Sequence, residues 1–187
     1  GKSDDERRMM INSIAPHWEG NQVWLVTAGA GIFAAWPSVY ATAFSGFYAA
    51  MIITLMALFF RPVGFDYRSK IEDPRWRTSW DWGIFIGSVV PPIVFGVAFG
   101  NILQGVPFVL DDLLRSSYQG GFFGLLNPFA LLVGVLSLIL FVLQGASWLQ
   151  MKTEGELYER ARAVSMICAP IAIVLFALAG VWIAYGI

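Results

Sequence analysis

Long apolar stretches separated by short polar connections run the length of this chain. Four stretches hold no charged residue, namely 38–60, 82–104, 127–150 and 163–187. Each is long enough to cross the roughly 30 Å of a bilayer core as an α-helix. A fifth stretch, 17–36, has its only ionisable groups at its start. The pattern predicts an all-α integral membrane protein, a transmembrane helix bundle with five crossings in one membrane domain.

Basic residues are concentrated in alternate connections. Of the twelve Lys and Arg residues, three lie in the leader 1–16, five in 61–81 and three in 151–162, whereas Arg115 alone lies in 105–126. Lys and Arg gather in cytoplasmic loops because their translocation is disfavoured. We therefore expect the leader and the connections 61–81 and 151–162 in the cytoplasm, and 105–126 in the periplasm.

The composition excludes several other classes of protein. Hydrophobic residues make up 57% of the chain and charged residues 13%, against about 25% charged in an ordinary soluble domain. The net charge of −1 offers no positive field for a nucleic-acid partner. The single cysteine, Cys168, excludes an internal disulfide and a cysteine-based metal site. Because the leader is too polar for a signal peptide and the chain opens at Gly1, we expect an internal portion of a longer protein.

Local signals predict where several helices begin and end. Ser3 and Glu6 can cap a helix whose first turn is acidic, and this amphipathic leader helix is expected to end at Pro16. Asn127 before Pro128 is typical of a helix start, so the fourth crossing should begin there.

The third crossing has the most informative pattern. Ser79 and Asp81 predict its start. Two glycine pairs follow, Gly83 with Gly87 and Gly96 with Gly100. At about 100° per residue these pairs point to roughly opposite faces, so the helix should be central and closely packed on two sides. Pro91 and Pro92 lie between the pairs and predict a bend, which leaves open an alternative function as half of a secondary transporter with a Pro-broken helix.

The outer connection 105–126 is expected to form one or two turns of surface-lying helix. Its apolar and charged residues alternate at helical spacing: Val109, Leu110, Leu113 and Leu114 with Asp111, Asp112 and Arg115.

Glu19 is a candidate functional residue, because ionisable groups at membrane depth are costly. It lies among hydrogen-bonding side chains between His17 and Trp24, where an ordinary crossing would already be apolar. One interpretation is a helix start, with the carboxylate near the positive end of the helix dipole. The other is a carboxylate at the mouth of a proton path from the cytoplasm.

Asp66 and Arg61 lie where the second crossing ends. Pro62 and Gly64 predict irregular backbone there, which must be buried in protein or face water. Asp66 either pairs with a nearby arginine or forms a hydrated carboxylate pair with Glu19 that relays protons.

His17 is the only histidine of the chain. A haem in a membrane bundle takes His or Met ligands, and one histidine cannot form a two-His site. We therefore expect no redox centre in this chain alone. The sequence also lacks a paired nucleophile and base, a phosphate-binding loop and metal-ligand spacing, so a self-contained hydrolase is unsupported.

Four strings carry a resemblance to a known family: residues 17–24, 60–68, 80–83 and 99–108. With them, essentially the whole chain closely resembles an internal portion of subunit II of cytochrome bd ubiquinol oxidase, a bacterial respiratory terminal oxidase. The resemblance implies about nine crossings in two four-helix bundles plus a peripheral helix, with five of them here.

The resemblance also implies an activity and its partners. Family members oxidise quinol and reduce oxygen to water in the bacterial cytoplasmic (inner) membrane, building proton-motive force without pumping. Subunit I holds the quinol site, two haems b and one haem d, whereas subunit II is haem-free. A small single-helix accessory subunit, quinone and lipid are further expected partners.

Residue by residue, the resemblance assigns Glu19 and Asp66 to a proton path and Trp24 to the lining of an oxygen tunnel. A supporting polar and aromatic cluster is expected from His17, Trp18 and Arg61.

Overall fold

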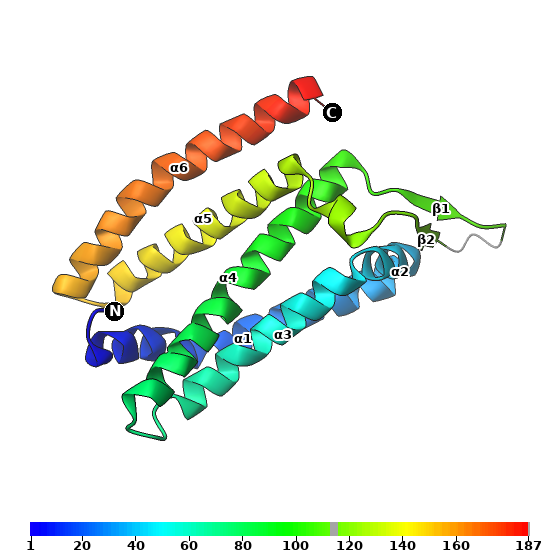
Figure 1. Cartoon of the computed structure of the whole chain (residues 1–187). Coiled ribbons are helices and arrows are strands. Elements are labelled where there is room, and N and C mark those ends of the chain that lie inside the picture. Colours follow the sequence, from blue (N-terminus) through cyan, green and yellow to red (C-terminus); the bar gives the residue numbers. More distant parts are fainter. Residues whose placement is uncertain (113–115, 187) are drawn as a thin grey trace.

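The computed structural model describes residues 1–112 and 116–186, and helices dominate it (Figure 1). Its elements are α1 (Asp4–Ala35), α2 (Pro37–Gly46), α3 (Tyr48–Tyr67), α4 (Pro74–Gln104), β1 (Phe108–Leu110), β2 (Ser116–Tyr118), the 3-10 helix η1 (Phe122–Leu125), α5 (Pro128–Lys152) and α6 (Glu156–Gly186). The predicted helical membrane class is confirmed, with one small hairpin added.

Four of the described helices, α3 to α6, are long and apolar enough to cross a membrane. The predicted crossing 38–60 is divided, because α2 ends at Gly46 and α3 begins at Tyr48, with Phe47 buried at the junction. The predicted crossing 17–36 lies in α1, which is not among these four candidates. Polar residues around Glu19 lower its hydropathy, and this crossing stays a prediction.

Helix α4 lies between α3 and α5 (Figure 1). Its first glycine pair faces α3, where a Cβ on Gly87 would lie 2.6 Å from the carbonyl oxygen of Ala57. Its second pair faces α5, where a Cβ on Gly96 would lie 2.6 Å from the carbonyl oxygen of Val133. The prediction of a central helix with close contacts on two opposite faces is confirmed.

Helix α6 packs along α5 and closes that side of the bundle (Figure 1). Phe129 and Val133 of α5 form a buried cluster with Ala179 of α6, and the ring of Trp182 lies 5.8 Å from that of Phe129. At the start of α5, the side chain of Asn127 accepts a hydrogen bond from the Ala130 amide at 2.8 Å. The predicted cap of this helix is confirmed.

Several prolines lie inside continuous helices. Helix α1 runs through Pro16, α3 through Pro62, and α4 through Pro91 and Pro92. The predicted helix end at Pro16 and the irregular backbone at Pro62 and Gly64 were therefore wrong. A proline removes one N–H, but neighbouring helices, hydroxyl side chains and small local adjustments can satisfy the freed carbonyl groups, so the helix continues.

Helix α4 begins earlier than the sequence suggested. Asp73 caps it by accepting a hydrogen bond from the Arg75 amide at 2.8 Å, and Pro74 is its first residue. The Ser79 hydroxyl instead donates to the Arg75 carbonyl at 3.0 Å. The predicted start at Ser79 was wrong, and Asp81 lies about two turns inside the helix.

A hairpin replaces the helix predicted for the outer connection. Strands β1 and β2 pair antiparallel, and the Thr42 hydroxyl of α2 lies 2.6 Å from that of Ser116 in β2. The helical prediction was wrong for Val109 and Leu110. Asp111 and Asp112 are not helical either, whereas Leu113, Leu114 and Arg115 lie outside the described residues.

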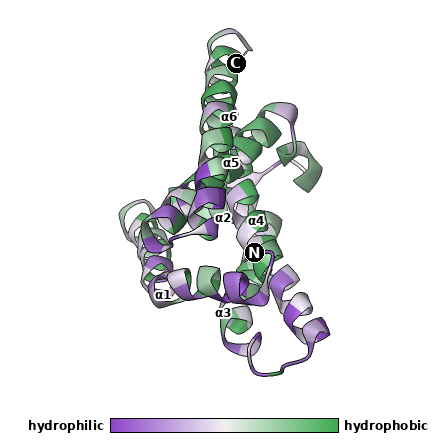
Figure 2. Ribbon diagram, turned by 90° about the vertical axis from the view of Figure 1, so that its left-hand side faces the viewer, coloured by the Kyte–Doolittle hydropathy of each residue, from purple (hydrophilic) through white to green (hydrophobic). Residues whose placement is uncertain are grey.

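The three basic segments meet at one end of the bundle. Arg68, after α3, binds Asp4 of α1 at 2.6 Å, and Arg160 of α6 binds Glu6 of α1 at 2.6 Å. Figure 2 shows hydrophilic residues around the N-terminus and the connection between α3 and α4, whereas α6 is hydrophobic over most of its length. The segments therefore share one side, and its assignment to the cytoplasm stays a prediction.

Candidate functional site

Glu19 lies on an exposed face of α1. Within residues 1–112 and 116–186, its carboxylate has neither a hydrogen bond nor an ion pair. It borders a shallow hollow of about 410 Å³ whose lining comes from α1 alone, between Trp18 and Ala30. No other residue in the described part of the chain therefore covers or pairs with this carboxylate.

Asp66 lies in the last turn of α3 and is also exposed. In the part of the chain that the structure describes, no arginine pairs with it, so the expected ion pair is not formed. The rings of Trp18 and Phe65, each next to one of the two acids in sequence, lie 6.2 Å apart. The structure thus brings the segments of Glu19 and Asp66 together and leaves both carboxylates exposed.

His17 belongs to a contact between α1 and α5. Its ring meets Trp148 edge-on at 5.3 Å, and the Trp148 indole donates a hydrogen bond to the Ser13 carbonyl at 3.1 Å. The ammonium group of Lys152 lies 5.1 Å from the centre of the same indole. His17 therefore packs against a tryptophan of a distant helix, and the cluster expected from His17, Trp18 and Arg61 stays a prediction.

Arg61 faces a cavity of about 610 Å³ at the basic end of the bundle. Residues of α1, α3, α4, α5 and α6 line this cavity. The Nε atom of Arg61 is buried and has no hydrogen-bond partner. Neither Glu19 nor Asp66 lines this cavity.

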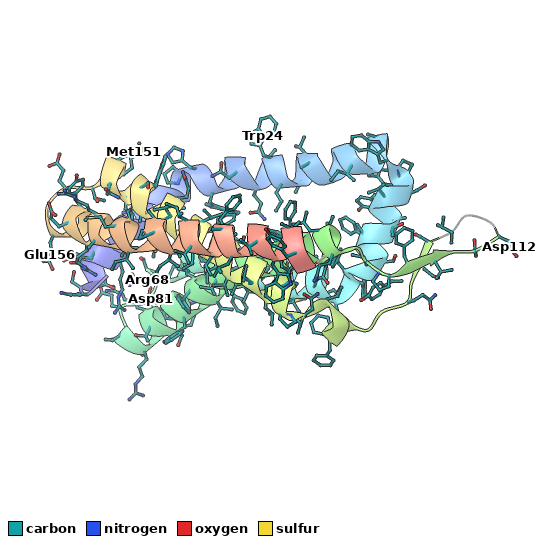
Figure 3. The ribbon with its side chains drawn as sticks, turned by 90° about the horizontal axis from the view of Figure 1, so that it is seen from above. Trp24, Arg68, Asp81, Asp112, Met151 and Glu156 are labelled. Carbon is teal, nitrogen blue, oxygen red and sulfur yellow. The ribbon has the colours of Figure 1, made fainter. Side chains whose placement is uncertain are left out.

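Arg68 is the centre of an ion-pair network that the sequence did not predict. It is 1% exposed, and it donates to Asp81 through Nε at 2.5 Å and to Asp4 through Nη2 at 2.6 Å. Arg7 also binds Asp81, at 2.9 Å, and Arg77 binds Asp4, at 2.8 Å. Figure 3 shows Arg68 and Asp81 beside one another. The network joins α1, α3 and α4.

A second pair extends the network to α6. Glu6 accepts from the Arg160 guanidinium at 2.6 Å and from the Lys2 amide at 2.5 Å, while Ser3 caps α1 by accepting from the Glu6 amide at 3.2 Å. The hydrogen bond from Arg160 lowers the pKa of Glu6 to about 2. The hydrogen bond from Arg68 likewise lowers the pKa of Asp4. Both acids therefore stay ionised at neutral pH.

The sequence held one signal for this network. An acidic first turn at 4–6 and a basic connection at 61–81 were both expected in the cytoplasm, so their charges could attract one another. Asp81 is the partner of Arg68 because of the way α3 and α4 cross, and the local sequence pattern does not determine that crossing.

Trp24 is 73% exposed and points away from the bundle (Figure 3). It lies on the same helix as Glu19, about one and a half turns further along. Its assignment to an oxygen tunnel stays a prediction. Within the described ranges, His, Cys, Asp and Glu side chains form no group of three that could hold a metal ion.

A family model described as cytochrome bd terminal oxidase subunit II matches residues 1–186. The chain belongs to this family. Subunit 2 of the cytochrome bd-I ubiquinol oxidase of Escherichia coli (strain K12) is 67% identical over all 187 residues, which cover 49% of that protein. A probable cytochrome oxidase subunit 2 of Haemophilus influenzae is 62% identical over 183 residues, 98% of this chain and 48% of that protein.

A more distant member of the subunit II family matches a somewhat shorter part of the chain. Cytochrome bd ubiquinol oxidase subunit 2 of Bacillus subtilis (strain 168) is 38% identical over 165 residues, 88% of this chain and 48% of that protein. The chain spans about half the length of the curated relatives it matches. The family resemblance predicted from the sequence strings is confirmed, as is the expectation of a partial chain.

Proposed function

We propose that this chain is the central portion of subunit II of a bd-type quinol oxidase in the bacterial cytoplasmic membrane, where it provides helical scaffold and takes up protons. The observation that carries this proposal is the pair of exposed carboxylates, Glu19 and Asp66, beside the contact between Trp18 and Phe65. Both acids lie toward the basic end of the bundle, which the positive-inside rule assigns to the cytoplasm.

The chemistry of the oxidase explains why such acids are needed. Reduction of oxygen to water consumes protons along with the electrons that quinol supplies. A carboxylate that water can reach binds a proton and passes it on, and acids within membrane segments are typical of proton relays. Glu19 and Asp66 have this exposure, whereas the acids of the Arg68 network are held ionised by arginines.

The residues of this chain do not fit a haem site. The sequence holds one histidine, and His17 is exposed with its ring packed edge-on against Trp148. A two-His site would need a second histidine. We therefore assign both haems b, the haem d and the quinol site to subunit I, the partner that the name of the relatives implies.

We assign Trp24 to the lining of a tunnel for oxygen. Its indole is exposed and points away from the described helices. Oxygen is a small apolar molecule, so an apolar wall suits its passage better than a polar wall that binds water. The rest of the protein would supply the opposite wall.

The alternative function as half of a secondary transporter loses its motivation. It depended on a helix broken at Pro91 and Pro92. Both prolines lie buried inside the continuous helix α4.

Oxygen consumption by the purified complex, with quinol in excess, tests the proton assignment. Glu19→Gln and Asp66→Asn should each lower turnover, by roughly tenfold or more if proton transfer becomes limiting, while the haem spectrum stays unchanged. Glu72→Gln is the matched control, because Glu72 is exposed in the connection between α3 and α4 and makes no ion pair there. Turnover that stays at the wild-type value in both variants would contradict the assignment.

A further inference from the structure

The cavity beside Arg61 combines a basic end with apolar walls. Three guanidinium groups line it, those of Arg7, Arg61 and Arg160, against one carboxylate, that of Asp81. Most of the remaining lining is apolar, including Ile14, Phe85, Val142, Leu149 and Val164. A ligand that fits both features has an anionic group and a hydrocarbon portion.

Arg61 differs from the other two arginines because it has no acidic partner. Arg7 is held by Asp81 at 2.9 Å, and Arg160 is held by Glu6 at 2.6 Å. Among the described residues, no side chain forms an ion pair or a hydrogen bond with Arg61, and its Nε is buried. A buried N–H of a charged group without a partner is costly, so this guanidinium is available for an external anion.

Gly87 fixes the course of the Arg61 side chain. A Cβ at Gly87 would lie 2.9 Å from Cγ of Arg61. The aliphatic part of the Arg61 side chain therefore packs directly against α4, and a residue larger than glycine at position 87 would crowd it. Arg61 is therefore held in place by packing before any ligand binds. A preformed guanidinium loses little side-chain entropy when it binds a planar or tetrahedral anion.

We propose that this cavity binds the phosphate of an anionic phospholipid from the membrane leaflet at the basic end of the bundle. The phosphate oxygens accept hydrogen bonds from Arg61, and an acyl chain lies against the apolar residues of α4, α5 and α6. Basic cavities between membrane helices on the cytoplasmic side are suited to anionic headgroups. Arginine binds phosphate through charge-assisted, often paired hydrogen bonds. This site is separate from Glu19 and Asp66, so it does not depend on the proton assignment.

Lipid retention by the complex containing the full-length protein tests the proposal. After purification in a neutral detergent, extraction and mass spectrometry should find anionic phospholipid retained by the wild type. Arg61→Gln should reduce the retained amount by roughly tenfold, since a charged hydrogen bond is lost. The matched control Arg75→Gln removes an equal charge from an exposed residue outside the cavity and should retain lipid as the wild type does. Equal retention by wild type and Arg61→Gln would overturn the proposal.

Thermal unfolding in lipid nanodiscs provides an independent measurement and identifies the source of the phosphate. The wild type should unfold at a higher temperature in phosphatidylglycerol than in phosphatidylcholine, and Arg61→Gln should lose this difference. Inorganic phosphate added to the phosphatidylcholine sample should not replace the anionic lipid. If inorganic phosphate gives the full stabilisation, or if both variants respond equally to phosphatidylglycerol, the lipid proposal is wrong. An equal response of both variants to phosphatidylglycerol would mean that Arg61 pairs with a carboxylate elsewhere in the full-length protein.

Discussion

Arg68 donates two hydrogen bonds to Asp81, from Nε to Oδ1 at 2.5 Å and from Nη2 to Oδ2 at 3.2 Å. This paired contact joins the end of α3 to α4, and the same guanidinium also binds Asp4 of α1. Arg68 is therefore the point where three helices are joined at the basic end. The fold around the exposed acids depends on this joint, since it fixes the ends of the helices that carry them.

Loss of the Arg68 guanidinium should destabilise the protein. Arg68→Gln leaves the carboxylates of Asp81 and Asp4 with only Arg7 and Arg77 as partners, and the loss of hydrogen bonds to charged groups costs about 1–3 kcal/mol. The free energy of unfolding of the full-length protein in mixed detergent micelles measures this effect. Arg75→Gln, at an exposed position, should change it by less than about 0.5 kcal/mol. Equal stability of the two variants would show that the network contributes nothing.

Gly96 should tolerate no side chain, because α4 and α5 are in backbone contact there. A Cβ at this position would lie 2.6 Å from the Val133 carbonyl oxygen and 2.7 Å from Cα of Gly134. Gly96→Ala should therefore lower the free energy of unfolding by about 1–3 kcal/mol. Gly180→Ala is the control, since a Cβ there meets nothing within 4 Å, and it should be neutral or stabilising by up to about 1 kcal/mol. A stable Gly96→Ala variant would contradict the close packing of α4 on α5.

Asn101 connects the end of α4 to the segment before α5. Its buried amide donates to the Leu125 carbonyl at 2.7 Å, and its oxygen accepts from the Asn127 side chain at 3.1 Å. Asn101→Ala would leave these groups unpaired, which should cost about 1–3 kcal/mol of unfolding free energy. Gln104→Ala, at an exposed position one turn away, should have little effect. If Asn101→Ala and Gln104→Ala have the same free energy of unfolding, the hydrogen bonds of the Asn101 side chain do not stabilise the protein.

The ion pair of Glu6 and Arg160 predicts a specific pH dependence. Because the folded protein lowers the pKa of Glu6 to about 2, and the unfolded chain keeps it near its ordinary value of about 4.5, the pair stabilises the fold at higher pH. That stabilisation is lost as the pH falls from about 5 toward 2. The difference in melting temperature between wild type and Glu6→Gln should therefore be constant from about pH 6 to 8 and narrow below about pH 5. Asp5→Asn, without an ion pair among the described residues, should show no such trend.

Features encoded in a few neighbouring residues could be predicted from the sequence. The caps at Ser3 and Asn127 were found because capping needs only a side chain and the amide three residues later. The two packed faces of α4 followed from the spacing of its glycines, because helical periodicity converts spacing into direction.

Features that depend on how helices meet could not be predicted. Pro16 and Pro62 were interpreted as helix breakers, yet α1 and α3 continue through them. Asp81 was interpreted as part of a helix start. In the structure Asp73 provides the cap, and Asp81 accepts a hydrogen bond from Arg68. Val109 and Leu110 fitted a short helical pattern as well as a strand, and the pairing with β2 decides between them.

The absorbance spectrum of the complex purified through a tag on the full-length protein tests whether this chain belongs to a haem-free subunit of a bd-type oxidase. Reduced bands of haem b and haem d are expected in the complex. After the subunits are separated under conditions that retain haem, all of it should remain with a larger partner and none with the tagged protein. A colourless preparation, or haem bound in stoichiometric amount to the tagged protein alone, would show that the chain is not such a subunit.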